Sequence, residues 1–394
     1  MELLSPAGDL ERCFFALLYG ADAIYASGKK FSLRANATNF TNEELEKCAK
    51  MVHSFNKKLY VPVNIIFHNK EVEDDLLEYL KFLEKIKVDA GIVSDAIVWD
   101  LINKNNLKLE IHISTQTSTL NSRACKFYEK VGATRIVLAR EATKEEIIRI
   151  KKNTSLELEV FISGAMCTSF SGRCVLSNYL TNRDSNRGGC VQACRFSYDC
   201  KSINNKFEIN SKDLNMIPYV KDLYDIGISS LKIEGRMRSI YYIATVLTTY
   251  RNIIKKIESK TLNDEYINYC EAIINRASNR DSICQYFNSN VDETTQYYTN
   301  GFREEANQDF LGLVLDYKNK HIYLEVRNYF KIGDTVQIIG PNDKVYEFTI
   351  DKILDENDSK VDVANKPKTL VKIPFNKPVE KHSMMRKKVF DILY

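Results

Sequence analysis

The chain has 394 residues, 44% of them hydrophobic and 27% charged, which is typical of a folded globular protein and excludes a largely disordered one. Its 56 Lys and Arg against 52 Asp and Glu give a net charge of +4, which excludes a polycationic protein but leaves room for a local basic surface. No apolar run is long enough to cross a membrane and the N-terminus lacks a secretion-signal pattern, so we expect a cytoplasmic protein with no membrane partner.

Short apolar runs alternate with helix-periodic stretches through the first two-thirds of the chain. In chain order, these runs are Glu2–Leu4, Asp22–Ala26, Leu59–Ile65, Ala90–Ser94, Leu109–Ser114, Arg135–Ala139, Leu158–Ser163 and Ser230–Glu234. Nearly continuous apolar strands separated by helices predict a parallel sheet covered by helices. Eight such units favour an α/β fold of the TIM type, a closed (βα)8 barrel over residues 1–260. An open doubly wound sheet is the alternative, although its Gly-rich dinucleotide motif is missing after the first run.

Polar residues gather at the carboxyl ends of the predicted strands, where barrels of this type place their active sites. They are Asn64, Asp95, His112, Gln116, Arg140, Glu141, Lys232, Glu234 and Arg236. Lys232 and Glu234 alternate along one strand and therefore face the same way. With Lys212, Asp213 and His112 they are the candidate catalytic residues. Internal ion pairs, and a hydrogen-bonded structural role for His112, are the alternatives.

Five of the ten cysteines fall between Cys167 and Cys200, within a connection (164–210) that follows the seventh predicted strand. A long connection usually carries function, and a reducing cytoplasm argues against disulfides. Six residues separate Cys167 from Cys174, fifteen separate Cys174 from Cys190, and three separate Cys190 from Cys194. These spacings differ from the paired C-x2-C motifs of structural zinc and resemble those of iron–sulfur ligands. A zinc site and unliganded thiols are the alternatives, and Cys200 is an alternative to Cys194 as the fourth ligand.

Arginines surround these cysteines. The loop contributes Arg173, Arg183, Arg187 and Arg195, and the predicted strand ends contribute Arg34, Arg140, Arg236 and Arg238. Because arginine binds carboxylates and phosphates through two parallel hydrogen bonds, the pattern predicts an anionic substrate. The candidate substrate-binding residues are Arg140, Arg173, Arg187, Arg195, Arg236 and Gln116. Pairing with acids of the barrel mouth is the alternative.

The tail changes character after a polar connecting stretch over residues 261–305. Short alternating runs within 306–394 are punctuated by turn pairs such as Gly333-Asp334 and Gly340-Pro341. They predict a small antiparallel β-barrel appended to the larger domain.

Several segments together resemble a known family. Glu159 to Ser177, E-V-F-I-S-G-A-M-C-T-S-F-S-G-R-C-V-L-S, resembles the signature of the U32 peptidase-like ("collagenase-like") family. Similar family motifs are Leu4–Gly8, His112–Gln116, Asn186–Cys194, Ser211–Leu214, Lys232–Met237 and Phe330–Asp334. The resemblance covers essentially the full chain. One departure is Ala193, where relatives usually carry proline, and it affects the stiffness of the loop and not its ligands.

The resemblance implies RNA hydroxylation and not proteolysis, because the layout is similar to that of the prephenate-dependent tRNA uridine(34) hydroxylases. It implies oxygen-independent formation of 5-hydroxyuridine in the tRNA anticodon loop, with prephenate as co-substrate. It also implies a [4Fe-4S] cluster on Cys167, Cys174, Cys190 and Cys194. Family members can occur in pairs, so a paralogous partner protein is a further expectation. Aromatic residues flanking the cysteines, Phe161, Phe170, Tyr179 and Phe196, either stack on a splayed base or simply pack.

Other functions remain as alternatives. Longer relatives act on a cytidine of 23S ribosomal RNA, and a metal-stapled RNA-binding or assembly factor would need no catalysis. Peptidase chemistry is disfavoured because the five histidines form no H-E-x-x-H motif and no G-x-S-x-G is present. A cysteine peptidase would have to pair His112 with a loop cysteine.

Overall fold

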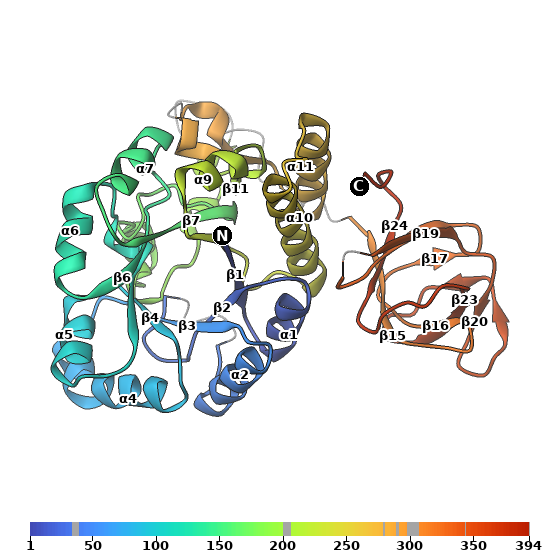
Figure 1. Ribbon diagram of the computed structural model, residues 1–394, viewed down its shortest axis with the longest axis horizontal. Coiled ribbons are helices and arrows are strands. Elements are labelled where there is room, and N and C mark those ends of the chain that lie inside the picture. Colours follow the sequence, from blue (N-terminus) through green and yellow to red (C-terminus); the bar gives the residue numbers. More distant parts are fainter. Residues whose placement is uncertain are drawn as a thin grey trace. The chain divides into compact units, whose positions relative to one another are not determined.

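A computed structural model describes residues 1–33, 39–199, 206–278, 280–288, 291–297, 307–342 and 344–393. Arg34 and Cys200, both considered above, lie outside these ranges. The chain forms two compact units, a barrel unit (Met1–Glu304) and a C-terminal unit (Glu305–Tyr394). Figure 1 shows the helices of the barrel unit and the all-β character of the C-terminal unit.

Eight parallel strands close into a barrel in the first unit (Figure 1). They are β1 (Glu2–Ala7), β2 (Ala23–Ala26), β3 (Lys58–Val63), β4 (Ala90–Val93), β5 (Glu110–Ile113), β6 (Ala133–Val137), β7 (Glu157–Gly164) and β12 (Ser230–Ile233). Strand β12 pairs with both β1 and β7, which closes the barrel. All eight predicted runs are barrel strands, so the closed barrel is confirmed and the open sheet is excluded.

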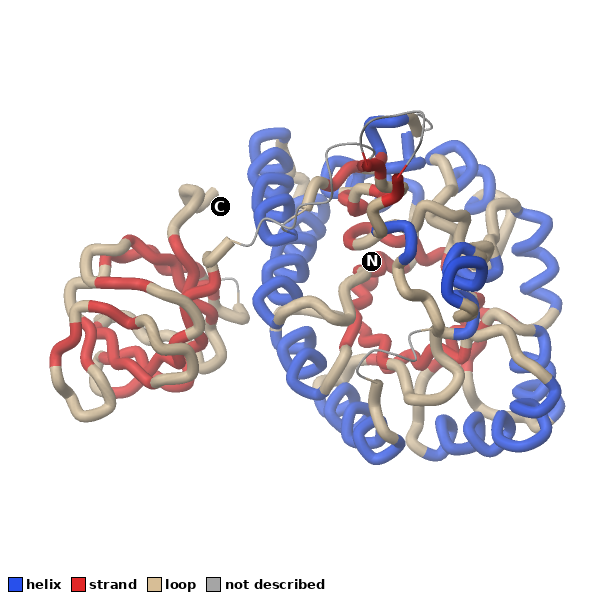
Figure 2. The backbone as a smooth tube through the Cα atoms, turned by 180° about the vertical axis from the view of Figure 1, so that it is seen from behind, coloured by secondary structure: helices blue, strands red, loops and turns tan. Residues whose placement is uncertain are grey.

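Helices surround the barrel strands, as Figure 2 shows from the opposite side. They are α1 (Leu10–Leu18), α2 (Asn42–Ser54), α4 (Leu77–Lys85), α5 (Ala96–Lys104), α6 (Ser122–Lys130), α7 (Lys144–Lys151), α9 (Val220–Ile226) and α10 (Ile240–Glu258). Several begin at a residue whose side-chain oxygen accepts a free backbone N–H. Thr41 and Thr143 form full capping boxes with Glu44 and Glu146. In the described part of the chain, no helix is both long and apolar enough to cross a membrane.

The long connection after β7 returns to the barrel as a short strand. Strand β11 (Asp213–Asn215) runs antiparallel to the end of β7, with Leu214 opposite Gly164. Strand β13 (Ser282–Ile283) extends this edge, and β14 (Gln296–Tyr297) pairs with β10 (Asn210–Ser211). The segment expected as a polar connection thus supplies helix α11 (Asp264–Ser278), which packs on α10, and two strands at the rim of the barrel.

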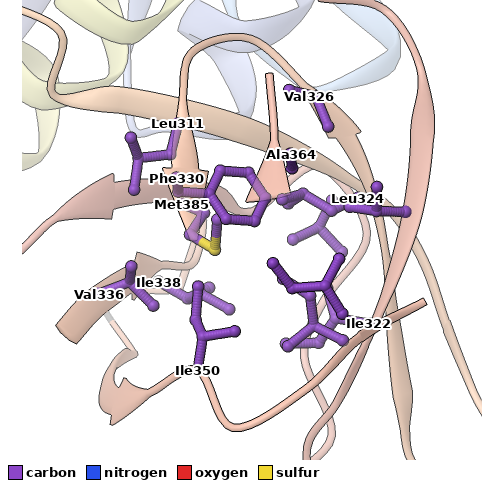
Figure 3. Close-up of a cluster of buried hydrophobic side chains, with 14 of the residues drawn as sticks. Leu311, Ile322, Leu324, Val326, Phe330, Val336, Ile338, Ile350, Ala364 and Met385 are labelled. Atoms are coloured by element: carbon purple, nitrogen blue, oxygen red, sulfur yellow. The ribbon is translucent and has the colours of Figure 1, made fainter. Parts of the chain in front are cut away.

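The C-terminal unit is a curled antiparallel sheet, as the alternation in the tail predicted. Its strands are β15 (Phe310–Lys318), β16 (His321–Val326), β18 (Thr335–Ile339), β19 (Val345–Thr349), β20 (Ile353–Leu354), β21 (Lys360–Val361), β23 (Leu370–Pro374) and β24 (Met384–Lys387), in the spatial order β19-β18-β24-β15-β16-β23-β20-β21. Two register irregularities in β15 bend the sheet around its core. Figure 3 shows that core, where Phe330 and Met385 lie among branched aliphatic side chains such as Ile322 and Ile338.

A network of ion pairs fills part of the barrel interior. The Arg135 guanidinium lies 2.6 Å from Glu2, 2.7 Å from Glu157 and 3.1 Å from Glu159, measured between nitrogen and oxygen atoms. Glu159 is fully buried, and burial alone would raise its pKa. The charges of Lys232 and Arg135 outweigh that effect and hold the pKa of Glu159 below its usual range. The interior charges therefore depend on one another for neutralisation.

We predict that Arg135→Ala lowers the free energy of unfolding of the barrel unit by about 3–5 kcal/mol, because it removes one of the two cations that neutralise the fully buried Glu159. Urea unfolding followed by fluorescence of Trp99, the single tryptophan of the chain, measures this change in the barrel unit. Arg149→Ala, at an exposed position on α7, is the matched control and should change stability by less than about 0.5 kcal/mol. Equal midpoints for the two variants would contradict the role assigned to the network.

Candidate active site

The cysteine segment (residues 167–195) is fastened over one end of the barrel. Glu141, after β6, accepts hydrogen bonds from the backbone N–H (3.0 Å) and hydroxyl (3.1 Å) of Ser171. Ser118, after β5, donates to the carbonyl of Ser171. After β3, the N–H of Ile66 donates to the carbonyl of Asn186 (3.2 Å). Because all three anchors follow the carboxyl ends of strands, the segment lies at the mouth where barrels of this type hold their active sites.

Two glycines allow the segment to approach the barrel closely. Gly172 has φ +75°, and a Cβ atom there would lie 2.0 Å from the carbonyl oxygen of Gln116. Gly164, at the end of β7, has φ +107°, and its Cβ would lie 2.2 Å from the carbonyl oxygen of Glu234. Both the left-handed backbone and the close contact exclude a side chain. These two glycines of the signature motif are therefore required for the backbone segments to pack this closely at the mouth.

The four cysteines of the segment lie close enough to affect one another. Burial raises the pKa of Cys194 to about 11, and the neighbouring thiols of Cys167, Cys190 and Cys174 add to the rise while Arg195 opposes it. Cys167 and Cys190 are exposed, Cys174 and Cys194 are half-buried, and none of these four described cysteines forms a disulfide. Among the residues described, no three Cys, His, Asp or Glu side chains already form a metal-binding geometry.

The backbone around the cysteines is held by its own hydrogen bonds. The N–H of Gln192 donates to the sulfur of Cys190 (3.4 Å), and the carbonyl of Cys174 accepts from Ser185 (2.8 Å) and Asn186 (3.1 Å). N–H groups directed at thiolate sulfur are characteristic of iron–sulfur sites, where they tune the reduction potential. Cysteine sulfur is the donor type that a soft metal centre takes.

Arg140 is nearly buried at the mouth and is only weakly neutralised. Its side chain is 12% exposed, and its guanidinium carbon lies 3.9 Å above the ring of Phe161. Within the described residues, the single acidic group near it is Glu234, at 3.9 Å. Glu234 in turn accepts a hydrogen bond from the hydroxyl of Tyr25 (3.2 Å). A guanidinium in this setting has donors left for an anion.

His112 and Lys232 point into the barrel interior. Lys232 lies 2.8 Å from Glu159 and 4.6 Å from the centre of the Tyr25 ring. The His112 ring packs edge-on against Tyr60 (4.7 Å between centroids), and its Nδ1 has no hydrogen-bond partner in the described structure. Burial lowers the pKa of His112, so the imidazole is neutral at physiological pH. Both residues therefore shape the floor of the site.

Asp213 forms a second cluster, at the rim of the barrel. Here one carboxylate lies among arginines, whereas in the interior network one arginine lies among carboxylates. It is buried, and its carboxylate lies 3.2 Å from Arg238 and 3.7 Å from Arg280. Burial raises the pKa of Asp213 despite these arginines and the nearby Arg195. Lys212, the preceding residue, is half-buried, with its ammonium 5.9 Å from the centre of the Tyr297 ring. A desolvated carboxyl group at a barrel mouth is a candidate for proton transfer.

The other predicted substrate-binding residues differ in how exposed they are and in what they contact. Arg187 forms an ion pair with Glu71 and donates to the carbonyl of Ile66, so it anchors the segment. Arg173 is exposed.

Arg195 is half-buried and donates a hydrogen bond to Gln192 (2.8 Å). Its pKa is lowered first by burial and then by the charge of Arg280. Arg236 is buried, and Gln116 is half-buried beneath Gly172.

Sequence reasoning named Glu159 only as an acid that pairs with arginines at the barrel mouth, and it did not identify Tyr25 or Arg280 as parts of the site. Tyr25 lies within a run read only as an apolar strand. Its hydroxyl group in an otherwise apolar strand was the available signal. Arg280 lies in the stretch expected as a connection, and the sequence carried no signal that β13 places it beside Asp213.

Comparison with known proteins agrees with the resemblance noted in the sequence. The model of peptidase family U32 matches residues 8–297, and that of the peptidase family U32 C-terminal domain matches residues 306–386. The chain is 39% identical to tRNA hydroxylation protein P1 of Bacillus subtilis (strain 168), over 98% of this chain and 94% of that protein. It is 31% identical to tRNA hydroxylation protein P of Escherichia coli (strain K12), over 89% of this chain and 88% of that protein.

A third relative has a different RNA target in its name. The chain is 35% identical to the 23S rRNA 5-hydroxycytidine C2501 synthase of Escherichia coli (strain K12). That match covers 65% of this chain and 40% of the relative.

We predict that Gly172→Ala loosens the cysteine segment, because the new Cβ combines an unfavourable backbone conformation with a clash against Gln116. Hydrogen exchange of peptides spanning residues 167–195 should become faster by at least about tenfold. Gly333→Ala is the matched control: Gly333 also has a positive φ (+90°), but nothing lies within 4 Å of its Cβ position. Unchanged exchange in Gly172→Ala would show that the close approach does not hold the segment.

Proposed function

Because this chain belongs to peptidase family U32, with long relatives named for tRNA hydroxylation, we propose that it is a cytoplasmic enzyme that hydroxylates uridine 34 of tRNA. The product is 5-hydroxyuridine, formed without molecular oxygen in the anticodon loop. One structural observation carries this proposal: the four cysteines gather on a segment fastened across the carboxyl-end mouth of the barrel.

Cys167, Cys174, Cys190 and Cys194 are the residues we propose to hold a [4Fe-4S] cluster. Four soft donors at the mouth, with the Gln192 N–H directed at the sulfur of Cys190, support this assignment. A bound cluster supplies one-electron transfer or, with an iron site open to a ligand other than cysteine, Lewis acidity.

Prephenate is the proposed co-substrate, and Arg140 the residue that binds one of its carboxylates. The guanidinium is held in place by the ring of Phe161, while its ion pair with Glu234 is long, at 3.9 Å. Its low exposure favours a small carboxylate over a phosphate of the RNA backbone. A bidentate contact here would orient the co-substrate beneath the cysteine segment. Arg236 and Gln116, on the same mouth, complete the proposed small-molecule pocket.

Asp213, Lys212 and Glu234 are the proposed proton-transfer groups. The raised pKa of Asp213 brings its titration closer to neutral pH, where a group can both take and return a proton.

Lys232 and His112 act from the interior of the barrel. Lys232 neutralises Glu159 at 2.8 Å, and the uncharged His112 adds no further positive charge beside that ion pair. Arg195 neutralises charge between the cysteines and Asp213.

A second candidate is hydroxylation of a ribosomal RNA cytidine, which the similarity to the 23S rRNA synthase favours. Deleting the gene separates the two candidates. Loss of 5-hydroxyuridine from tRNA supports the first, and loss of 5-hydroxycytidine from ribosomal RNA supports the second. If each loss is restored only by adding a related family member with this chain, the enzyme acts with a paralogous partner.

We predict that the anaerobically purified chain contains about four irons and four sulfides and that Cys174→Ala abolishes both this content and tRNA hydroxylation. Cys284→Ala, which removes a half-buried thiol outside the cysteine segment, is the matched control and should retain both. A colourless wild-type protein that holds one zinc would overturn the redox proposal and favour a metal-stapled RNA-binding factor.

We predict that Arg140→Gln raises the KM for prephenate by about 10- to 100-fold, since charge-assisted hydrogen bonds contribute about 1.5–3 kcal/mol. Steady-state kinetics with saturating tRNA measure this change. Arg149→Gln, an exposed position on α7, should leave KM unchanged. A KM equal to that of wild type in Arg140→Gln would place the carboxylate-binding site elsewhere.

A further inference from the structure

Exposed apolar side chains are concentrated on the cysteine segment. Of the ten large hydrophobic residues that are exposed in the described barrel unit, four fall within residues 167–195, namely Phe170, Val175, Tyr179 and Leu180, and Phe196 follows directly. Isolated exposed apolar residues need no explanation, but a concentration of them in so short a stretch indicates a surface that binds something.

The most exposed of these side chains lies on a short helix whose other face is held down. Helix α8 (Leu176–Thr181) places Ser177 inward, where its hydroxyl accepts the N–H of Val191 (3.2 Å). Tyr179, on the outer face, is 86% exposed, and Phe170 is 53% exposed. Phe161, by contrast, is buried and lies under the guanidinium of Arg140. The outer aromatic rings therefore make little contribution to packing.

Positive charge accompanies these rings. The segment 167–195 carries four arginines and one acidic residue, Asp184. The Asp184 carboxylate is half-buried and accepts the N–H of Asn186 (2.8 Å), so it is engaged by its own turn. Arg173 and Arg183 are both exposed. Arg173 closes a tight turn by donating its backbone N–H to the carbonyl of Phe170 (3.0 Å), and its side-chain Nε donates to the hydroxyl of Ser118 (3.3 Å).

We propose that Phe170, Arg173, Val175, Tyr179, Leu180 and Arg183 form a stacking surface for the unpaired nucleotides of the RNA substrate. Bases stack on the rings of Tyr179 and Phe170, and Arg173 and Arg183 contact the flanking phosphates. Exposed rings interleaved with arginines suit single-stranded RNA better than a protein partner, whose docking face would be more continuously apolar. This inference rests on the proposed RNA substrate and adds where its loop binds, outside the pocket of Arg140.

The test is binding of a fluorescent tRNA anticodon stem-loop to the full chain, measured by anisotropy. Tyr179→Ala and Phe170→Ala should each weaken binding by about tenfold, the contribution of one stacked base. Phe127→Ala is the matched control because Phe127 is 54% exposed on α6, outside the segment, and it should bind like wild type. Arg173→Gln and Arg183→Gln should each reduce the slope of log Kd against log salt by about 0.7.

The outcomes separate this inference from the proposed function. If wild type neither binds nor hydroxylates tRNA, the proposed function fails and the surface loses its substrate. If wild type does both and Tyr179→Ala binds as tightly as Phe127→Ala, the stacking surface alone is wrong. If Tyr179→Ala changes the molar mass in light scattering but not RNA affinity, the surface docks protein and the inference is overturned. Because Tyr179 is so exposed, its substitution leaves folding intact.

Discussion

The cysteine segment is fastened to the mouth of the barrel, and a buried carboxylate is one of its anchors. Glu141 follows β6 and accepts two hydrogen bonds from Ser171, which lies between Cys167 and Cys174. The position of Ser171 brings Gly172 onto the carbonyl of Gln116, a contact that only glycine permits. Together with the contacts of Ser118, Ile66 and Arg187, it holds a long polar connection across the mouth. The gathering of the thiols, the placing of the arginines and the exposure of the aromatic rings all depend on this fastening.

The fastened segment separates two chemical environments. On the barrel side of the segment, Arg140 lies over Phe161, and Lys232 lies near Tyr25 and forms an ion pair with the buried Glu159. A guanidinium that is only weakly neutralised and only 12% exposed suits a small anion. Above it, exposed rings and arginines face solvent, where stacking and phosphate contacts suit a nucleic-acid loop.

Many features were readable from the sequence because their causes are local. Barrel strands are buried on both faces, so they appear as short apolar runs, and all eight were found. The spacing of the cysteines identified the segment directly.

The roles of individual side chains were harder to predict. His112 lies one residue before the end of β5, and its ring packs against Tyr60, a contact that the sequence did not indicate. The weak neutralisation of Arg140 and the exposure of Tyr179 could not be read from their neighbours in the sequence.

The sequence by itself determined the (βα)8 barrel, the antiparallel C-terminal unit, the family and the clustering of four thiols in one connection. Only the tertiary structure decided which arginines already have an acidic partner. Arg187 forms an ion pair with Glu71, and Arg280 forms one with Asp213 although it lies in a stretch predicted to be a connection. The reason is that strand and helix patterns follow from the periodic burial of near neighbours. The partner and exposure of a charged side chain depend instead on groups far away in sequence that folding brings within a few ångströms.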